Sequence, residues 1–534
     1  MDPGDRLGPA DLVIALVVLV AAIALSLQPH LANAARAGDR VYLGLSENPT
    51  DQAVYLAWVE QARRGALVLG NMFDAHPAPA KLPNLTFLVI GRLAALTGTP
   101  AREAYVAARF GALVLLAGAL LALAAALTRS AAARRLALVW MLLGGGGGAA
   151  FVLAQAGRDA PDALEQVRAR VWVPADVALP EFTPAGAAAN FAHLLTGMAL
   201  MALSLALLVH ARTQRSVPRA LAAGGAALLA GYAHIYALIV LLAVAAALLA
   251  RAAWRGDRPL ARALAAYLAV AAVPFAHYVA LFATDPYLRS WARVPLPSPA
   301  PSAYAAGLGA ALLLAIPGLW RMRRAAVTAD DELVCAWMLV QGALLYSAPL
   351  FDFERRMCEG WFFAFVIVSA SEVAHRLSGC GAAARAVALA ALGALVLPTG
   401  PLVQGLASHR EPSHRFYFRA ADELAATERV GRETPADAVI LADPAASLYL
   451  PGLAGRRVAV GHVDHTRDYR VMVQAVVRFL AGQMPRPEAL AFLEYTGATH
   501  FFSVTLDVVP PPLGPDVLAP VFVQGRYGLF RVKR

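Results

Sequence analysis

The stretch ADLVIALVVLVAAIALSLQ, residues 10–28, is apolar almost throughout. Crossing the hydrocarbon core of a bilayer takes about 20 such residues in a helix. The whole chain has the same character, since 59% of its 534 residues are hydrophobic and 15% are charged, against about 25% charged in an average soluble domain. The composition therefore predicts a polytopic α-helical membrane protein. We interpret residues 10–28 as an uncleaved first span, because a basic n-region is lacking.

Further spans are predicted downstream, because apolar runs of comparable length recur as far as residue 405. The run 219–250 is about twice as long as a short span and is interrupted by the polar segment GYAHIY, which favours a hairpin of two short helices. Residues 84–98 form a shorter run that includes Arg92, and we expect an interfacial helix there. The other predicted spans are 104–128, 136–154, 187–211, 261–283, 303–320, 332–350, 360–376 and 386–405, which gives about 11 in all.

Arginine clusters between the spans agree with this count. If residues 29–103 form an outer loop, every loop assigned to the cytoplasm is rich in arginine, as the positive-inside rule requires. The clusters are Arg129, Arg134 and Arg135; Arg212, Arg215 and Arg219; Arg251, Arg255, Arg258 and Arg262; Arg321, Arg323 and Arg324; and Arg376 and Arg385. Arg355 and Arg356 are the main exception and fall on the outer side. Their position on the outer side needs a separate explanation. The net charge of +10 does not indicate nucleic-acid binding, because most arginines lie in short clusters between apolar runs.

The composition changes after Gln404. Residues 406–534 alternate strand-like segments such as AVILAD and THFFSVT with amphipathic helical segments such as YRVMVQAVVRFLAG. This alternation predicts a small α/β domain. We therefore expect a membrane domain, 1–405, with an outer juxtamembrane loop, 29–103, and a domain 406–534 that an odd number of spans places outside the cytoplasmic membrane.

The first candidate for chemistry is a carboxylate in the outer loop. In SENPTDQAVYLAWVEQARRG, residues 46–65, Asp51 stands at the start of a predicted amphipathic helix. It is a candidate general base for an acceptor hydroxyl, with Glu47 as a neighbouring candidate. The alternative interpretation is a helix N-cap, a position that Thr50 or Asn48 would also suit.

The second candidate is the arginine pair in PLFDFERRMCEGWFF, residues 349–363. Guanidinium groups bind phosphate oxygens in a bidentate geometry, so Arg355 and Arg356 are candidate phosphate ligands at the outer side. The alternative is a set of local ion pairs with Asp352, Glu354 and Glu359, which would contribute little if exposed.

Several outer segments carry polar residues that could belong to a functional site, and the sequence does not favour one of them over another. The long loop 155–186 offers Asp159, Asp162, Glu165, Arg168, Arg170 and Glu181, and the loop 284–302 offers Asp285, Tyr287, Arg289, Trp291 and Arg293. Long irregular connections are often functional. The segment VGHVDHTRDY, 460–469, follows a predicted strand, and we favour docking or acceptor binding there over a metal site of His462, Asp464 and His465.

The order of these features resembles the GT-C class of polytopic glycosyltransferases, which includes protein O-mannosyltransferases and lipid A aminoarabinose transferases. A first span, an outer-loop carboxylate, an amphipathic helix, a proline-rich segment and an interfacial helix follow one another. HPAPAKLPN is similar to the proline-rich element of the class but lacks its adjacent prolines. The hairpin AGGAALLAGYAHIYALIVLL resembles the short paired helices of the class.

The resemblance implies transfer of a sugar from a polyprenyl-phosphate donor to a glycan, lipid or protein acceptor at the outer face of the cytoplasmic membrane. Asp51 matches the acidic residue of the class by position, and the arginine pair would hold the leaving phosphate in an inverting displacement. Further candidates for lining the cavity are Tyr55, Asp74, His76 and Arg289. No metal site is predicted, but members of the class differ in their need for a divalent cation, so this need stays open. A lipid-binding scaffold and a transporter or flippase are the alternatives.

Overall fold

The computed structural model describes residues 7–156, 173–291, 294–324, 328–348, 350, 352–507 and 511–533. The chain divides into two compact units. One unit, here called the helical unit, comprises Met1–Pro29 and Arg109–Ser408. The other, here called the mixed unit, comprises His30–Ala108 and His409–Arg534. The first outer loop therefore forms one compact unit with the C-terminal residues.

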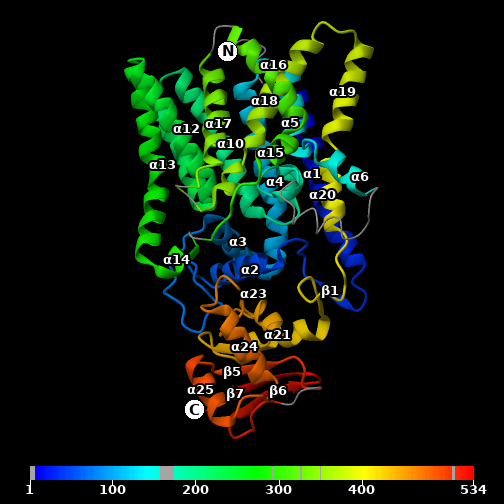
Figure 1. Ribbon diagram of the computed structural model, residues 1–534, viewed down its shortest axis with the longest axis vertical. Helices are drawn as coiled ribbons and strands as arrows, with labels where there is room; N and C mark the ends of the chain where they lie inside the picture. Colours follow the sequence, from blue (N-terminus) through cyan, green and yellow to red (C-terminus); the bar gives the residue numbers. More distant parts are fainter. Residues whose placement is uncertain are drawn as a thin grey trace. The chain divides into compact units, whose positions relative to one another are not determined.

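The helical unit consists almost entirely of helices (Figure 1). In chain order they are α1 (Pro9–Ala35), α4 (Ala101–Leu127), α5 (Ala131–Leu143), α6 (Gly148–Ala156), α8 (Ala175–Ala178), α9 (Pro184–Ala188), α10 (Ala192–Thr213), α11 (Val217–Ala233), α12 (Ile235–Trp254), α13 (Arg258–Thr284), α14 (Pro286–Trp291), α15 (Pro301–Leu308), α16 (Ala310–Arg324), α17 (Ala329–Leu344), η2 (Glu354–Cys358), α18 (Trp361–Leu377), α19 (Ala382–Val396) and α20 (Thr399–Ala407).

Within the described residues, seven helices are long and apolar enough to cross a membrane, or up to eight if the pair α15 and α16, bent by 85°, forms one span. The prediction of 11 spans is not confirmed. Helices occupy the other predicted positions, but α11 has 17 residues, α17 has 16 and α5 has 13. A helix rises about 1.5 Å per residue, so these lengths fall short of a 30 Å hydrocarbon core.

The predicted span 136–154 is interrupted by its glycines, and the interruption has a packing cause. A Cβ atom at Gly146 would lie 2.1 Å from the carbonyl oxygen of Gly307, a distance that no real Cβ atom adopts. The buried carboxylate of Asp176 accepts hydrogen bonds from the backbone N–H groups of Gly146 (2.7 Å) and Gly148 (3.2 Å). Burial raises the pKa of Asp176 to about 6. The glycine run thus permits a close approach between backbones.

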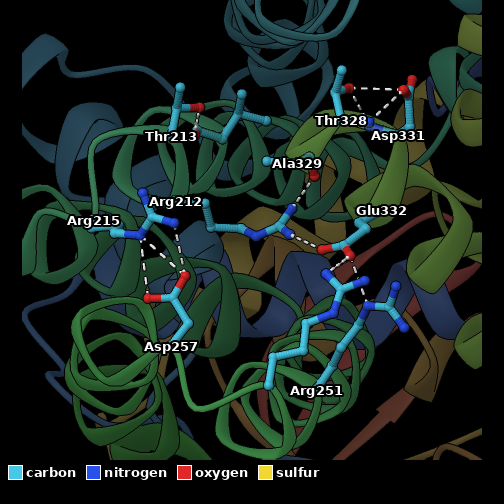
Figure 2. A network of polar contacts seen from close by, with 11 residues as sticks. Arg212, Thr213, Arg215, Arg251, Asp257, Thr328, Ala329, Asp331 and Glu332 are labelled. Carbon is cyan, nitrogen blue, oxygen red and sulfur yellow. Dashed lines mark hydrogen bonds and ion pairs between the residues drawn. The ribbon is translucent and has the colours of Figure 1, made fainter. Parts of the chain in front are cut away.

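Residues of three predicted cytoplasmic arginine clusters meet at the start of α17, and Figure 2 shows two of these clusters, at Arg212 and Arg251. Glu332 accepts hydrogen bonds from Arg212 (3.1 Å) at the end of α10 and from Arg251 (2.7 Å) and Arg255 (2.5 Å) at the end of α12. The turn between α4 and α5 contributes Arg129, which contacts Thr328 and Asp331 beside it. This arginine-rich end of the unit therefore gathers residues that the positive-inside rule assigned to one side of the membrane.

The mixed unit combines helices and a sheet. Its helices are α2 (Pro49–Arg63), α3 (Leu85–Thr97), α21 (Ala421–Glu433), α22 (Pro444–Ser447), α23 (Leu450–Leu453), α24 (Tyr469–Leu480) and α25 (Arg486–Tyr495), and its strands are β1 (Arg40–Tyr42), β2 (Phe418–Ala420), β3 (Val439–Ala442), β4 (Arg457–Val458), β5 (His500–Ser503), β6 (Leu518–Gln524) and β7 (Tyr527–Val532). The expected helix at 84–98 is present as α3.

Five strands form a sheet in the order β4-β3-β5-β7-β6. The pairs of β3 with β4 and with β5 are parallel, and the pairs of β7 with β5 and with β6 are antiparallel. The buried core joins β3, β5 and β7 to α24 and α25 through residues such as Leu441, Phe479, Phe492, Phe501 and Phe530. The predicted α/β character of the C-terminal region is confirmed. Strand β1 of the outer loop pairs with β2, which ties the loop to this region.

Candidate active site

Asp51 lies in the first turn of α2. The helix begins at Pro49 with Asn48 as its N-cap residue, so the interpretation of Asp51 as the N-cap is wrong. Oδ2 of Asp51 accepts a hydrogen bond of 2.6 Å from the side-chain amide of Asn48. The helix dipole favours a negative charge in this turn. One third of the Asp51 side chain is exposed, so its carboxylate is fixed and still accessible.

His462 faces this carboxylate. Its Nε2 atom lies 3.8 Å from Oδ1 of Asp51, too far for a direct hydrogen bond. Burial lowers the pKa of His462 to about 4, so the imidazole is neutral at pH 7. Its Nδ1 atom accepts the backbone N–H of Asp464 at 3.1 Å, which leaves the ring proton on Nε2. Among the described residues this buried Nε2 has no hydrogen-bond acceptor.

The loop that carries His462 follows β4 and is held from several sides. The hydroxyl of Thr466 accepts the backbone N–H groups of Gly461 (3.1 Å) and His462 (3.3 Å) and donates to the carbonyl of Phe73. The ring of His465 packs against that of His462 at 4.6 Å between centroids. In mixed and parallel sheets, ligand sites gather beyond the carboxyl ends of parallel strands. His462 occupies such a position.

Asp74 and His76 hold the backbone of the mixed unit. Asp74 is buried, and its carboxylate accepts the backbone N–H groups of His76 (3.0 Å) and Arg467 (3.3 Å). Nε2 of His76 lies 2.7 Å from the carbonyl oxygen of Tyr495. These contacts give both residues a structural role in positioning the loop 461–468.

The other predicted residues of this unit make packing contacts. The ring of Tyr55 stacks on Phe87 of α3 at 5.0 Å between centroids. Glu47 is half-buried, and its backbone carbonyl accepts from the side chain of Gln52. Of the predicted residues, Asp51 is therefore the one whose contact with His462 suggests acid–base chemistry.

Arg356 lies in the short helix η2 of the helical unit and forms an ion pair with Glu181. The Glu181 side chain is fully buried. Burial acts to raise the pKa of Glu181, but the charges of Arg356 and Arg355 outweigh it and lower this pKa. Glu181 is thus a buried carboxylate that keeps its charge and holds a guanidinium in place.

Arg355 differs from its neighbour. Its backbone N–H donates to the carbonyl of Leu296 at 3.2 Å, and its side chain is half-buried. Across the described residues, the structure records no hydrogen bond or ion pair of its guanidinium, and its Nε atom is buried without an acceptor. Two of the carboxylates proposed as local partners of the arginines bind other groups. Glu354 accepts a hydrogen bond from the backbone N–H of Ser298 (3.3 Å), and Glu359 forms an ion pair with His234.

One buried side chain, that of Gln341, fixes η2 and the residue that follows it. Gln341 of α17 donates to the carbonyls of Met357 (2.6 Å) and Glu359 (2.7 Å). Because α17 begins at the arginine-rich end and Gln341 lies near its other terminus, η2 lies toward the opposite end of α17 from Glu332. This location agrees with the prediction that Arg355 and Arg356 break the positive-inside pattern.

Arg289 binds the backbone at the end of α13. Arg289 donates to the carbonyls of Phe282 (3.1 Å) and Ala283, which cap the end of α13. Residues 157–172, which include Asp159, Asp162, Glu165, Arg168 and Arg170, and residue Arg293 lie outside the described residues.

The acidic and histidine residues do not assemble a metal site in the part of the chain that the structure describes, where no group of three or more His, Cys, Asp or Glu side chains is suitably placed. This holds for His462, Asp464 and His465, and His76 beside them in the mixed unit contacts the carbonyl oxygen of Tyr495. We therefore derive no step of the reaction through a metal.

Solved structures with a similar fold include three glycosyltransferases. The Archaeoglobus fulgidus oligosaccharyltransferase superposes with a TM-score of 0.57 at 12% identity, over 92% of this chain and 70% of that chain. ArnT from Cupriavidus metallidurans, bound to undecaprenyl phosphate, gives 0.50 at 14% identity over 98% of both chains. Arabinofuranosyltransferase AftD from Mycobacteria gives 0.51 at 14% identity over 97% of this chain and 41% of that chain. All three are GT-C glycosyltransferases.

The chain has the GT-C fold. The resemblance that the order of sequence features indicated is confirmed at this level. No family model matches the sequence, and no curated protein matches it. Identities of 11–14% establish the fold alone, so the chemistry of this GT-C chain has to be argued from its own residues.

Proposed function

We propose that this GT-C chain is a membrane glycosyltransferase that moves a sugar from a polyprenyl-phosphate donor to a hydroxyl acceptor at the outer face of the cytoplasmic membrane. The observation that carries the proposal is the placement of the Asp51 carboxylate 3.8 Å from Nε2 of the buried His462. The fold supports the donor class, because ArnT is bound to undecaprenyl phosphate and the archaeal enzyme to a dolichol-phosphate. The acceptor is a glycan, a lipid or a protein.

The separation of Asp51 and His462 suits an acceptor hydroxyl between them. An oxygen about 2.8 Å from each group would accept from Nε2–H of His462 and donate its proton to Asp51. A neutral imidazole provides this donor without competing for the proton. The arrangement would orient one lone pair of the acceptor oxygen for attack while the carboxylate takes the proton.

The reaction balances without a further reactant. The acceptor oxygen forms a bond to the anomeric carbon, and the bond from that carbon to the phosphate oxygen breaks. The proton passes to Asp51 and the electron pair to the leaving group, which departs as polyprenyl phosphate. Attack from the face opposite the leaving group inverts the configuration.

Arg355 is the residue proposed to stabilise the leaving phosphate. The charge on that phosphate grows as the carbon–oxygen bond breaks, and a guanidinium with open donors stabilises it. Arg356, whose charge is largely balanced by Glu181, would be a second and weaker ligand of that phosphate. Because Arg355 and Asp51 belong to different compact units, both are tested in one assay.

The test is release of free polyprenyl phosphate. The full chain, reconstituted in vesicles, is given a panel of polyprenyl-phosphate sugars and an extract of its own cell envelope as the acceptor source. Asp51→Asn is expected to lower release by about 10²–10⁴-fold, the usual contribution of a general base. Arg355→Gln is expected to lower it by about 10²–10³-fold, as for loss of one charge-stabilising donor. The same assay with and without a chelator tests the need for a divalent cation.

Matched controls separate chemistry from folding. Asp39→Asn changes an exposed carboxylate of the same unit, and Arg289→Gln changes an arginine that caps a helix; both are expected to release at the wild-type rate. If no donor is turned over, although wild type and variants fold and bind lipid alike, the proposal is wrong and a lipid-binding scaffold is favoured. Accumulation of intact donor across the vesicle membrane would indicate a transporter or flippase.

A further inference from the structure

The helical unit contains an apolar cavity of about 1150 Å³ that the reaction proposed above does not use. Its walls come from α1, α5, α18 and α19, through residues such as Val18, Trp140, Val373, Leu389 and Leu392. Small-molecule sites are about 300–1,000 Å³, so this cavity has room for a ligand larger than most substrates.

Apart from Ser371, whose hydroxyl donates to the carbonyl of Ile367 within α18, the polar residues of the cavity lie at one end of it. They are Arg129, Ser130, Arg135, Arg321, Asp331, His375, Ser378 and Arg385. Each comes from the same end of its helix: the residues after α4, the start of α5, α17 and α19, and the last turns of α16 and α18. This is the arginine-rich end. The cavity is therefore amphiphilic, with apolar walls along the helices and a polar mouth.

The mouth carries more arginines than carboxylates. Asp11 pairs with both Arg134 and Arg135. Glu372 pairs with both Arg321 and Arg376.

Two more arginines belong to this end. Arg129 pairs with Asp331 at 3.5 Å. Arg385 donates only to the carbonyl of Cys380, and the described residues offer it no carboxylate. A positive charge therefore remains at the mouth, and it complements an anionic group.

One wall of the cavity has few protein neighbours. Val396 is the only buried residue among those described in α19. In the most apolar stretch of the span Ala382–Ala407, 22% of the residues are buried. Hydrocarbon chains would fill the space between this helix and α5 and would contact apolar side chains on both walls. A soluble ligand would leave most of this surface unfilled.

We propose that the cavity binds an anionic glycerophospholipid of the cytoplasmic leaflet, with its acyl chains between α19 and α5 and its phosphate at Arg385 and Arg129. Basic pockets between membrane helices on the cytoplasmic side bind such head groups. The positive-inside pattern assigns the mouth to that side. The proposed donor phosphate site at Arg355 lies toward the other end of α17, so this lipid is distinct from the donor.

The test measures lipid that stays bound. The full chain is exchanged into detergent with equal amounts of phosphatidylglycerol and phosphatidylcholine, and retained lipid is counted by native mass spectrometry. Wild type is expected to retain phosphatidylglycerol in preference. Arg385→Gln is expected to reduce its affinity about fivefold, because one basic residue near an anionic head group contributes about 1 kcal/mol.

A second variant fills the cavity without changing charge. Gly393 lines it, and a Cβ atom there would meet only Leu397 at 3.6 Å, an ordinary contact. Gly393→Phe is therefore expected to fold and to lose the bound lipid. Arg262→Gln, an exposed arginine of α13 outside the cavity, is expected to bind like wild type.

Three outcomes would overturn the proposal. Equal retention by wild type, Arg385→Gln and Gly393→Phe would mean that only annular lipid is bound. Equal retention of phosphatidylcholine would remove the role of the arginines. Preferential retention of added polyprenyl phosphate over phosphatidylglycerol would assign the cavity to the donor lipid. None of these outcomes depends on turnover, so they can be told apart from failure of the proposed reaction.

Discussion

Because His462 is buried and neutral, we expect acid to destabilise the mixed unit. Substituting His462 should remove this part of the pH dependence. The ordinary pKa of a histidine is 6.5, and burial lowers that of His462 to about 4. Between these values the unfolded chain binds a proton that the folded chain does not. The stabilisation is therefore fully present above pH 6.5 and is lost as the pH falls toward 4. At about 1.36 kcal/mol per pH unit, the loss is about 3 kcal/mol.

His462→Asn is the informative change, because the asparagine oxygen can replace Nδ1 as acceptor for the backbone N–H of Asp464. The substitution removes the titratable imidazole but keeps the hydrogen bond from the backbone N–H of Asp464. We expect the free energy of unfolding of wild type to fall between pH 6.5 and 4 by about 3 kcal/mol more than that of the variant. His465, whose pKa burial also lowers, titrates in both proteins and largely cancels in the difference.

The assay is urea unfolding of the full chain in detergent at a series of pH values, detected by proteolysis within residues 409–534. The control is His414→Asn, since His414 is exposed and its Nδ1 accepts the backbone N–H of Phe416 at 3.3 Å in the same local geometry. The control should follow wild type at every pH. A constant difference between wild type and His462→Asn across this pH range would refute the assignment of His462 as a buried neutral donor.

Two further predictions concern the helical unit. Gly146→Ala should lower the thermal stability and yield of the full chain by an amount equivalent to about 1–3 kcal/mol, because its Cβ would collide with the Gly307 carbonyl; Gly118→Ala, with open space around the new methyl group, should not. Glu332→Gln should cost about 3 kcal/mol in thermal unfolding, because it removes the carboxylate partner of buried Arg212. Asp257→Asn, which breaks an exposed pair, should have little effect, and equal effects of the last two would contradict this account.

The membrane character of the fold could be predicted from the sequence, because apolar runs and arginine loops are local signals. The break at Gly144–Gly148 could not, since its cause is the backbone of Gly307, more than a hundred residues away along the chain. The same limit explains the number of spans. Hydropathy detects α5, α11 and α17, but the lengths of these helices are set by tertiary turns and caps.

The candidate site shows the same division between local and long-range information. The position of Asp51 at a helix start follows from spacing, but its partner His462 comes from a loop beyond β4 and no sequence signal connects the two. Likewise, the sequence offered Glu181 as one of several loop carboxylates and gave no reason to pair it with Arg356. Asp74 and His76 looked like site residues because they are polar in an outer loop, and the backbone bonds that occupy them are visible only in the folded chain.

The two arginines of η2 illustrate how a buried charge separates two residues that the sequence treats alike. Removing a carboxylate from water is costly, and Glu181 stays charged because Arg356 compensates it. Arg356 is then committed to that pair, and its own charge is largely balanced before any ligand arrives. Arg355 shares the electrostatic field of Glu181 but keeps its donors open among the described residues. An anionic leaving group would therefore gain new hydrogen bonds from Arg355 and would have to compete with Glu181 for those of Arg356.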